Sequence, residues 1–172
     1  VHFLHNTAKL AHLSISPENI YITREGKVKL AGFTCSKELK ELSSNSIHFS
    51  YSTYCDGNLA CAPNLRFTAP EIVDENTASQ QSDVFSLGCV LYYLLNIDKG
   101  EDAFALKLSN QYNTQQHMRA TEELKRSFDT KFAHLPYALK ALFRSSLDPN
   151  KDSRGTVNSM VENGFFQDPL IK

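Results

Sequence analysis

The stretch from Ser82 to Leu95 constrains the fold more than any other part of the sequence. It opens with Ser82-Asp83, a pair suited to capping a helix, and its apolar residues then fall on every face of a helix. Such a helix must be buried, so the rest of the chain has to pack around it. With 172 residues, 41% of them hydrophobic, the chain can build one core. We therefore expect one mainly α-helical domain around a buried central helix.

Composition and charge exclude several classes of protein. The formal net charge is −1, whereas nucleic-acid binders usually carry a strong basic excess. No apolar run is long enough to cross a bilayer, and the first residues do not resemble a signal peptide. No Cys-x-x-Cys pair is present, so we expect reduced cytosolic thiols and no metal site. The cysteines are Cys35, Cys55, Cys61 and Cys89.

Outside the central helix, the pattern predicts a small β-hairpin near the N-terminus and further helices. Residues 20–23 and 28–31 are short β-branched runs around a Gly-containing turn, which is typical of a hairpin. Residues 1–8 resemble the end of a helix already under way, so the chain looks cut from something longer. Residues 32–66 are expected to be irregular. Further helices are expected on the surface within 101–131, from Pro136 to about Leu147, and over 157–163.

Five motifs in a fixed order resemble those of a protein kinase. In chain order they are His12–Asn19, Gly32–Thr34, Ala69–Glu71, Asp83–Gly88, and Asp148-Pro149 with Arg154. They occupy the frames of the kinase sequences H-R-D-L-K-P-x-N, D-F-G, A-P-E and D-x-W-S-x-G, and of the late Asp-Pro and Arg. Any one match is weak, but the ordered set is specific.

The resemblance implies that residues 1–172 are the larger, helical lobe of the kinase fold. It identifies 12–19 as a degenerate catalytic loop and 32–71 as a degenerate activation segment. The smaller lobe, with its glycine-rich loop and ATP-contacting lysine, is absent from this sequence. We therefore expect an exposed apolar face where that lobe would pack in the intact parent protein.

The residues that carry kinase chemistry are replaced. Ser14 stands where an Asp orients the substrate hydroxyl, and Ser16 where a lysine neutralises the transferred phosphate. Gly32 replaces the main magnesium ligand and has no side chain. Asn19, the second metal ligand of the family, remains. The resemblance thus implies a pseudokinase with no catalytic residues, no resident metal and no required cofactor.

Leu13 replaces the arginine that pairs with a phosphorylated activation segment in many kinases. We therefore expect that phosphorylation does not order this segment in the usual way. Hydroxyl groups are nonetheless plentiful in the loop 43–54, which is either a regulated docking surface or a solvated loop. They belong to Ser43, Ser44, Ser46, Ser50, Ser52 and Thr53.

The residues that support the kinase fold are all present. By the resemblance, Asp83 accepts hydrogen bonds from the backbone of the catalytic loop, and Glu71 forms a buried ion pair with Arg154. His12 is expected to pack beneath the activation segment, and Phe33 to pack where the D-F-G phenylalanine does. The other five histidines are expected to be ordinary polar positions: His2, His5, His48, His117 and His134.

Local details resemble the SCY-like pseudokinases. The altered loop His12–Asn19 and the Gly32-Phe33 pair fit that family, and Asp56–Asn64 and Phe165–Asp168 are similar to its coated-vesicle-associated member. The family implies a cytoplasmic scaffold that binds proteins in clathrin-dependent traffic between Golgi and endosomes, peripheral to those membranes.

Two alternatives to a purely non-catalytic module stay open. One is a weak or unconventional serine/threonine kinase that binds ATP with little or no magnesium, for which Asn19 and Glu18 provide polar groups. The other is nucleotide binding without turnover that stabilises one conformation for a partner. Asn19 itself could contact a nucleotide or metal, or could hold the loop through backbone hydrogen bonds.

Overall fold

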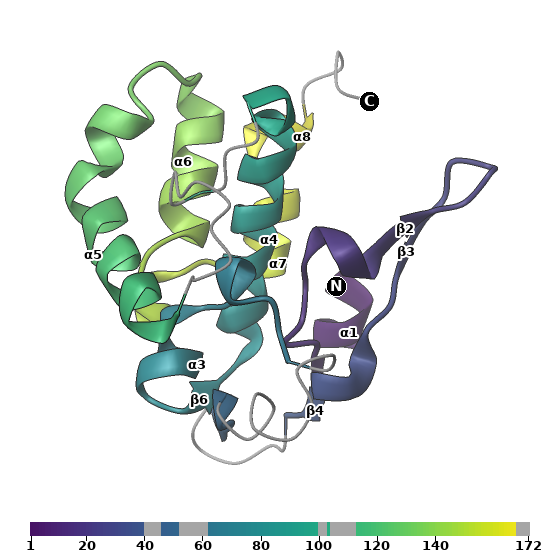
Figure 1. Ribbon diagram of the computed structural model, residues 1–172. Helices are drawn as coiled ribbons and strands as arrows, with labels where there is room; N and C mark the ends of the chain where they lie inside the picture. Colours follow the sequence, from purple (N-terminus) through teal and green to yellow (C-terminus); the bar gives the residue numbers. More distant parts are fainter. Residues whose placement is uncertain (40–45, 52–61, 100–102, 104–112, 168–172) are drawn as a thin grey trace.

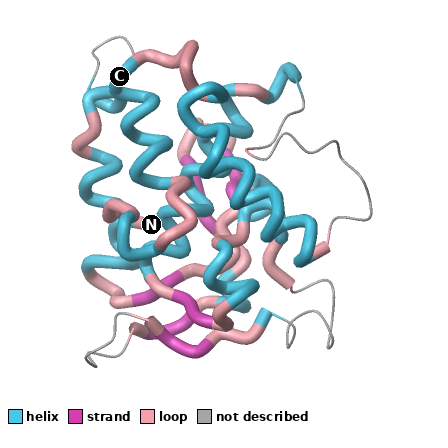
Figure 2. Tube along the Cα trace, turned by 90° about the vertical axis from the view of Figure 1, so that its left-hand side faces the viewer, coloured by secondary structure: helices cyan, strands magenta, loops and turns pink. Residues whose placement is uncertain are grey.

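The structure is a computed structural model that describes residues 1–39, 46–51, 62–99, 103 and 113–167. It confirms a mainly α-helical domain with small strand pairs (Figures 1 and 2). The helices are α1 (His2–Asn6), α3 (Pro70–Asp74), α4 (Gln80–Leu95), α5 (Thr114–Lys131), α6 (Tyr137–Ser146), α7 (Val157–Val161) and α8 (Gly164–Gln167). The strands are β1 (Leu10–Ala11), β2 (Ile20–Ile22), β3 (Val28–Leu30), β4 (Lys37–Glu38), β5 (Ile47–His48) and β6 (Thr77–Ala78). The 3-10 turns are η1 (Pro17–Asn19), η2 (Phe33–Cys35), η4 (Leu65–Phe67), η5 (Ile97–Lys99) and η6 (Lys151–Ser153).

The central helix α4 begins three residues earlier than its sequence suggests. Its cap is Ser79, whose backbone N–H donates to Ser82 Oγ at 3.0 Å and whose carbonyl accepts the Ser82 N–H at 3.1 Å. The predicted cap pair Ser82-Asp83 is therefore wrong, because both residues lie inside the first turn. Asp83 is not needed as a cap, and its carboxylate instead serves the loop that carries the candidate site.

Burial of α4 holds over most of its length but not at its C-terminal end. Val84, Phe85 and Cys89 are almost completely buried. Leu94 and Leu95, in contrast, are 53% and 48% exposed. Burial along the whole helix, which the apolar pattern predicts, is therefore wrong for the last turn within the described residues.

Helix α6 packs against α4, and α5 packs against α3 and η4, on the side of the domain away from the hairpin (Figure 1). An aromatic cluster fills the space between them, with the rings of Tyr92 and Phe132 5.6 Å apart and those of Phe132 and Phe143 5.2 Å apart. The predicted helix from Pro136 is confirmed, with Pro136 as its cap residue. The described part of 101–131 forms one amphipathic helix, as expected for a surface position.

The predicted β-hairpin is confirmed as β2 and β3, which pair antiparallel with Ile20 opposite Leu30. The hairpin projects from the body of the domain (Figure 1). Two further antiparallel pairs, β1 with β4 and β5 with β6, were not predicted. Each strand in those pairs has two residues, too few for alternation to appear in a sequence.

The end of the activation segment is fixed by the predicted ion pair. The Arg154 guanidinium donates to both carboxylate oxygens of Glu71, each at 2.7 Å, and both side chains are almost fully buried. Ser82 Oγ donates to the same carboxylate at 2.7 Å. Arg154 also donates to the backbone carbonyls of Asp148, Pro149 and Gln81. The pair therefore ties α3, α4 and the turn before α7 together.

Two histidines differ from their expected role as ordinary polar positions. His5 is buried and His117 is fully buried. His117 lies on α5 and bonds the backbone of Thr68, just before α3. Burial lowers the pKa of His117 to about 4, so this imidazole is neutral near neutral pH. No helix among the described residues is long and apolar enough to span a membrane.

We expect Glu71→Gln to lower the free energy of unfolding by about 3–5 kcal/mol, because it leaves the Arg154 guanidinium buried without its countercharge. Chemical denaturation of the intact protein measures this. Glu122→Gln is the matched control, since Glu122 forms an exposed pair with Arg126 within α5 and its loss should change little. Equal effects of the two substitutions would contradict the role given to the buried pair.

His117 should make stability depend on pH. Its folded pKa lies below the unfolded value near 6.5, so the unfolded state takes up the proton first as pH falls. The contribution of His117 to the free energy of unfolding is fully present above pH 6.5. It falls by about 3 kcal/mol as the pH falls toward 4. His117→Gln should weaken the pH dependence of the denaturation midpoint between pH 6.5 and 4. His134→Gln, at an exposed position, should leave that dependence unchanged. Parallel curves for wild type and His117→Gln would refute this assignment.

Candidate functional site

The Asp83 carboxylate organises the loop that carries the candidate site. Its oxygens accept the backbone N–H groups of His12 at 2.7 Å and Leu13 at 2.8 Å. It also accepts from Nε2 of His5 at 2.8 Å. Leu13 adopts a left-handed backbone conformation with φ 62°, which is unfavourable for a residue with a Cβ. The predicted contacts of Asp83 with the loop are thus present, and they hold a strained turn in place.

His12 joins the loop to the start of the activation segment. It is fully buried, its Nε2 donates to the Ala31 carbonyl at 2.9 Å, and its Nδ1 accepts the Ser14 N–H at 3.3 Å. Its ring meets the Phe33 ring edge-on at 4.7 Å. Burial lowers the pKa of His12, against the opposing influence of the Asp83 charge and the bond to Ala31. Both nitrogens of the ring are engaged within the protein, so this geometry gives His12 a positioning role.

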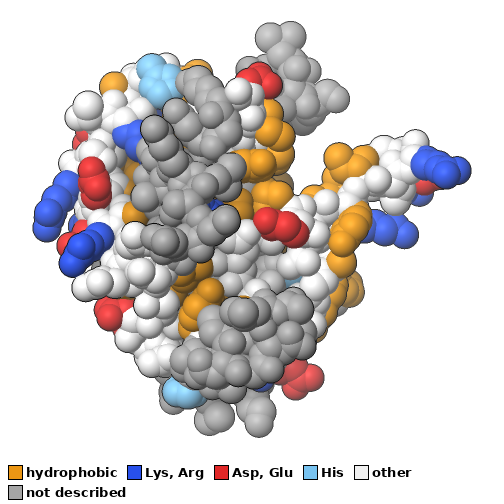
Figure 3. All heavy atoms as spheres, in the orientation of Figure 1, with side chains coloured by type: hydrophobic (Ala, Val, Ile, Leu, Met, Phe, Trp, Pro, Cys, Tyr) orange, Lys and Arg blue, Asp and Glu red, His pale blue; other side chains and the backbone are white. Residues whose placement is uncertain are grey.

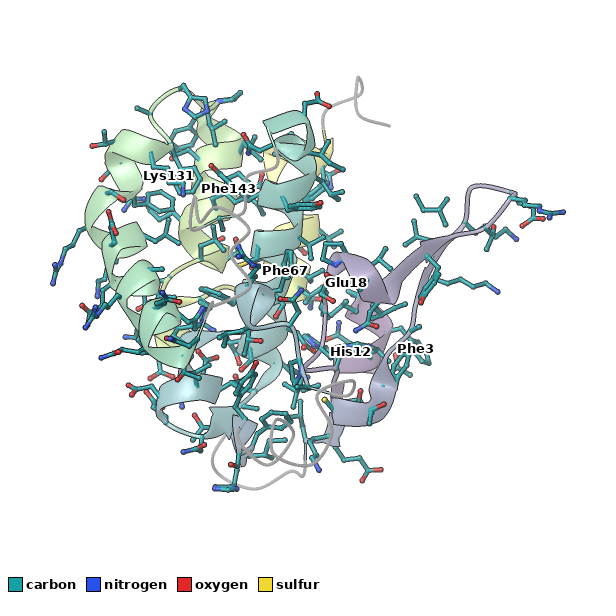
Figure 4. The ribbon with its side chains drawn as sticks, viewed as in Figure 1. Phe3, His12, Glu18, Phe67, Lys131 and Phe143 are labelled. Atoms are coloured by element: carbon teal, nitrogen blue, oxygen red, sulfur yellow. The ribbon has the colours of Figure 1, made fainter. Side chains whose placement is uncertain are left out.

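A cavity of about 250 Å³ opens beside this loop. In Figure 4, His12 and Glu18 lie on the N-terminal segment, next to the segment that carries Phe67. Hydroxyl and amide groups dominate the described part of the cavity wall, which has one carboxylate and no lysine or arginine. The lining residues are Ser14, Ser16, Glu18, Asn19, Gly32, Thr34, Ala62 and Asn64. The structure therefore brings together, around one cavity, the four motif positions that carry the chemistry in a kinase: Ser14, Ser16, Asn19 and Gly32.

Asn19 closes the region where a kinase would hold its metal. Its Nδ2 donates to the Ser14 carbonyl at 2.7 Å and to Ser14 Oγ at 3.2 Å. A Cβ added to Gly32 would lie only 2.4 Å from Cγ and Oδ1 of Asn19. Gly32 also has φ +78°, which residues with side chains rarely adopt. Of the two possibilities for Asn19, the geometry shows the loop-holding bonds, and the Asn19 amide occupies the space that a side chain at position 32 would need.

The far wall of the cavity is joined to the loop through Asn64. Its Nδ2 donates to Glu18 Oε1 at 2.9 Å, and its carbonyl accepts from Thr68 Oγ1 at 2.9 Å. The sequence motifs did not identify Asn64, Thr34 or Ala62 as site residues. For Asn64 a signal existed, because it stands shortly before Ala69-Pro70-Glu71 and belongs to the stretch that resembles the SCY-like family.

The described residues offer a magnesium ion a poor set of ligands. Gly32 offers no oxygen from a side chain, and Asn19, whose amide nitrogen donates to Ser14, can offer only its neutral Oδ1. The Glu18 carboxylate already accepts from Asn64. Magnesium prefers an octahedral set of oxygens with at least one carboxylate. Among the described residues no group of three or more His, Cys, Asp or Glu side chains could hold a metal.

Some predicted residues lie outside the part of the chain that the structure describes. They are Ser43, Ser44, Ser52, Thr53, Cys55, Asp56–Leu59, Cys61 and Asp168. Of the cysteines within the described ranges, Cys35 and Cys89 are both buried.

The contact between Asn19 and position 32 can be measured with alanine. Gly32→Ala should destabilise the protein more than Gly26→Ala, since Gly26 has a similar φ of +76° but open space around it. The left-handed conformation alone costs about 1–2 kcal/mol at either position, and the clash adds to it only at 32. In an Asn19→Ala background, the excess at position 32 should disappear. Equal costs at both glycines would contradict the packing of Asn19 over Gly32.

Comparison with known proteins gives the family. The protein kinase domain matches residues 1–166. Protein kinase-like protein SCY1 of Saccharomyces cerevisiae is 29% identical over 99% of the chain and 21% of its own length. SCY1-like protein 2 of Homo sapiens is 28% identical over 96% of the chain and 18% of its length.

Serine/threonine-protein kinase PKH2 of Saccharomyces cerevisiae is also similar, at 27% identity over the whole chain and 15% of its own length. The chain thus spans about a fifth or less of the length of these relatives. Because the domain match covers nearly all of the sequence, the chain belongs to the protein kinase domain family, among the kinase-like proteins related to SCY1.

Proposed function

We propose that this chain is a non-catalytic kinase-like module that works by binding other proteins. The observation that carries the proposal is the packing of the Asn19 amide over Gly32. Gly32 lacks the side chain of the metal ligand, and in addition the Asn19 side chain fills the space that a side chain at position 32 would occupy. Among the described lining residues, the carboxylate that a metal could use is that of Glu18, which already accepts a hydrogen bond from Asn64.

The other chemical positions support the same proposal. Ser14 provides a hydroxyl where proton acceptance is needed, and a serine hydroxyl is no base near neutral pH. The described cavity lining has no cation to stabilise a transferring phosphoryl group, since Ser16 replaces the lysine. Glu18 is the one charged side chain among the described lining residues, and a carboxylate repels phosphate oxygens.

Exposed apolar side chains provide a surface for a protein partner or for the rest of the parent protein. On the hairpin, Tyr21, Ile22 and Val28 are 58%, 74% and 69% exposed. Leu94, Leu95 and Ile97 are about half exposed at the end of α4. Figure 3 shows apolar surface on the hairpin and on the side of the body that faces it. Large exposed apolar patches usually mark interaction sites.

The cellular role follows from the resemblance to the SCY-like family. On that basis we place the parent protein in the cytoplasm, as a scaffold in clathrin-dependent traffic between Golgi and endosomes. The likeness to SCY1 and SCY1-like protein 2 supports the family assignment on which this role rests.

A second candidate is a weak kinase or a nucleotide-responsive module that binds ATP with little or no magnesium. The open cavity beside Ser14 and Asn19 favours it, because these polar groups could accept a sugar or phosphate without a metal. The likeness to PKH2, named a serine/threonine-protein kinase, also keeps this candidate in view.

Thermal unfolding of the intact protein with ATP distinguishes these candidates. At a hundredfold excess over its Kd, a ligand adds about 2.7 kcal/mol to stability, which is readily seen. The main proposal predicts no shift that requires magnesium. A shift in EDTA would support the nucleotide-responsive candidate, and a shift only with magnesium would overturn the argument from Asn19 and Gly32. Magnesium without ATP is the control.

A further inference from the structure

Residues 46–51 are tied by their backbone to the connection between α3 and α4. Strand β5 pairs antiparallel with β6, with Ile47 opposite Ala78 and His48 opposite Thr77. The next residue continues the contact, since the Phe49 N–H donates to the Asn76 carbonyl at 2.8 Å. This short segment of the activation region therefore has a defined place on the body of the domain.

The Phe49 side chain anchors the same segment in the core. It is only 2% exposed and is among the largest fully buried side chains. Ile47 and Tyr51, two residues away on each side, pack against the core as well. Withdrawing the segment would expose a complete aromatic side chain to water, which opposes its release.

Tyr51 connects this anchor to the wall of the cavity. Its hydroxyl donates to the Pro63 carbonyl at 3.1 Å. The residues on either side of Pro63, Ala62 and Asn64, line the cavity, and Asn64 holds Glu18. Tyr51, two residues from the buried Phe49, is thus linked through Pro63 and Asn64 to Glu18 in the degenerate catalytic loop.

We propose that residues 46–51 are a permanently closed clasp, which fixes the cavity wall at residues 62–68 without phosphorylation. The contacts described above are backbone hydrogen bonds, an apolar anchor and a tyrosine hydroxyl, and these do not require a phosphate. Leu13, where phosphorylation-dependent kinases carry an arginine, could not pair with one. The partner strand is itself supported, because Lys151 Nζ donates to Thr77 Oγ1 at 3.3 Å and pairs with Glu75 at 3.2 Å. This inference does not depend on what the cavity binds or on whether the protein turns over ATP.

Hydrogen exchange on the intact protein, made in bacteria and shown by mass spectrometry to carry no phosphate, tests the proposal. Two amides report on the wall: the Phe67 N–H, bonded to the Asn64 carbonyl, and the Thr68 N–H, bonded to the Leu65 carbonyl. We expect these amides and that of Phe49 to be protected in the phosphate-free protein. Protection that appears only after a kinase has modified Ser46 or Ser50 would overturn the proposal.

Two substitutions test the path from clasp to wall. Phe49→Ala should speed exchange of the Phe67 and Thr68 amides by about tenfold or more, because opening of the segment becomes easier, while amides of α4 keep their rates. Tyr137→Ala is the control, since Tyr137 is 88% exposed on another part of the surface. Unchanged rates at Phe67 and Thr68 in Phe49→Ala would contradict the proposal.

If Phe49→Ala also loosens α4, then Tyr51→Phe decides. It removes one hydroxyl and keeps the ring, so it should raise exchange at Phe67 and Thr68 about fivefold, the equivalent of one hydrogen bond. No change at these amides in Tyr51→Phe would show that the clasp does not hold the wall.

Discussion

The candidate site depends on one carboxylate, that of Asp83. It lies inside the first turn of α4, fully buried, and receives the backbone N–H groups of His12 and Leu13 and the ring N–H of His5. Buried carboxylates are stable only when their oxygens are bonded in this way. In return, Asp83 holds Leu13 in a conformation that it would not adopt alone. The central helix thereby dictates where the loop can lie, and with it the position of every residue that lines the near side of the cavity.

In this chain the contacts that support the kinase fold are present, whereas the groups that perform kinase chemistry are replaced. Glu71 and Arg154 form a buried, two-pronged ion pair between segments far apart in sequence. The wall of the cavity, in contrast, has hydroxyl and amide groups where phosphoryl transfer needs a base, a cation and a metal ligand. A protein that works through its surface needs the first set and not the second. These contacts hold the catalytic loop and the end of the activation segment in place, as the binding module that we propose requires.

The sequence predicted best what is marked by ordered motifs. The partners of Asp83 and Glu71 are many residues distant, yet the resemblance to the kinase family that the ordered motifs carry was enough to pair them. The sequence predicted poorly the features that depend on local packing in three dimensions. The cap of α4 was misplaced because Ser79 and Ser82 are both good cap residues, and only the structure shows which one is outside the helix. His5 and His117 were missed because they lie outside any motif, although each is buried by packing. Likewise, the sequence shows that an Asp is absent at Gly32 but not that Asn19 occupies its place.

The central claim is that the cleft has lost phosphoryl transfer, and turnover of ATP tests it most directly. The intact protein would be incubated with labelled ATP, magnesium and a general protein substrate, beside a Ser14→Ala variant. We predict no transfer above the level of Ser14→Ala, because Ser14 contributes no base and its hydroxyl is bonded to Asn19. Equal traces of transfer in both proteins would indicate a contaminating kinase and agree with this prediction. Turnover by the wild type that Ser14→Ala abolishes would show that the site is catalytic and would contradict the claim.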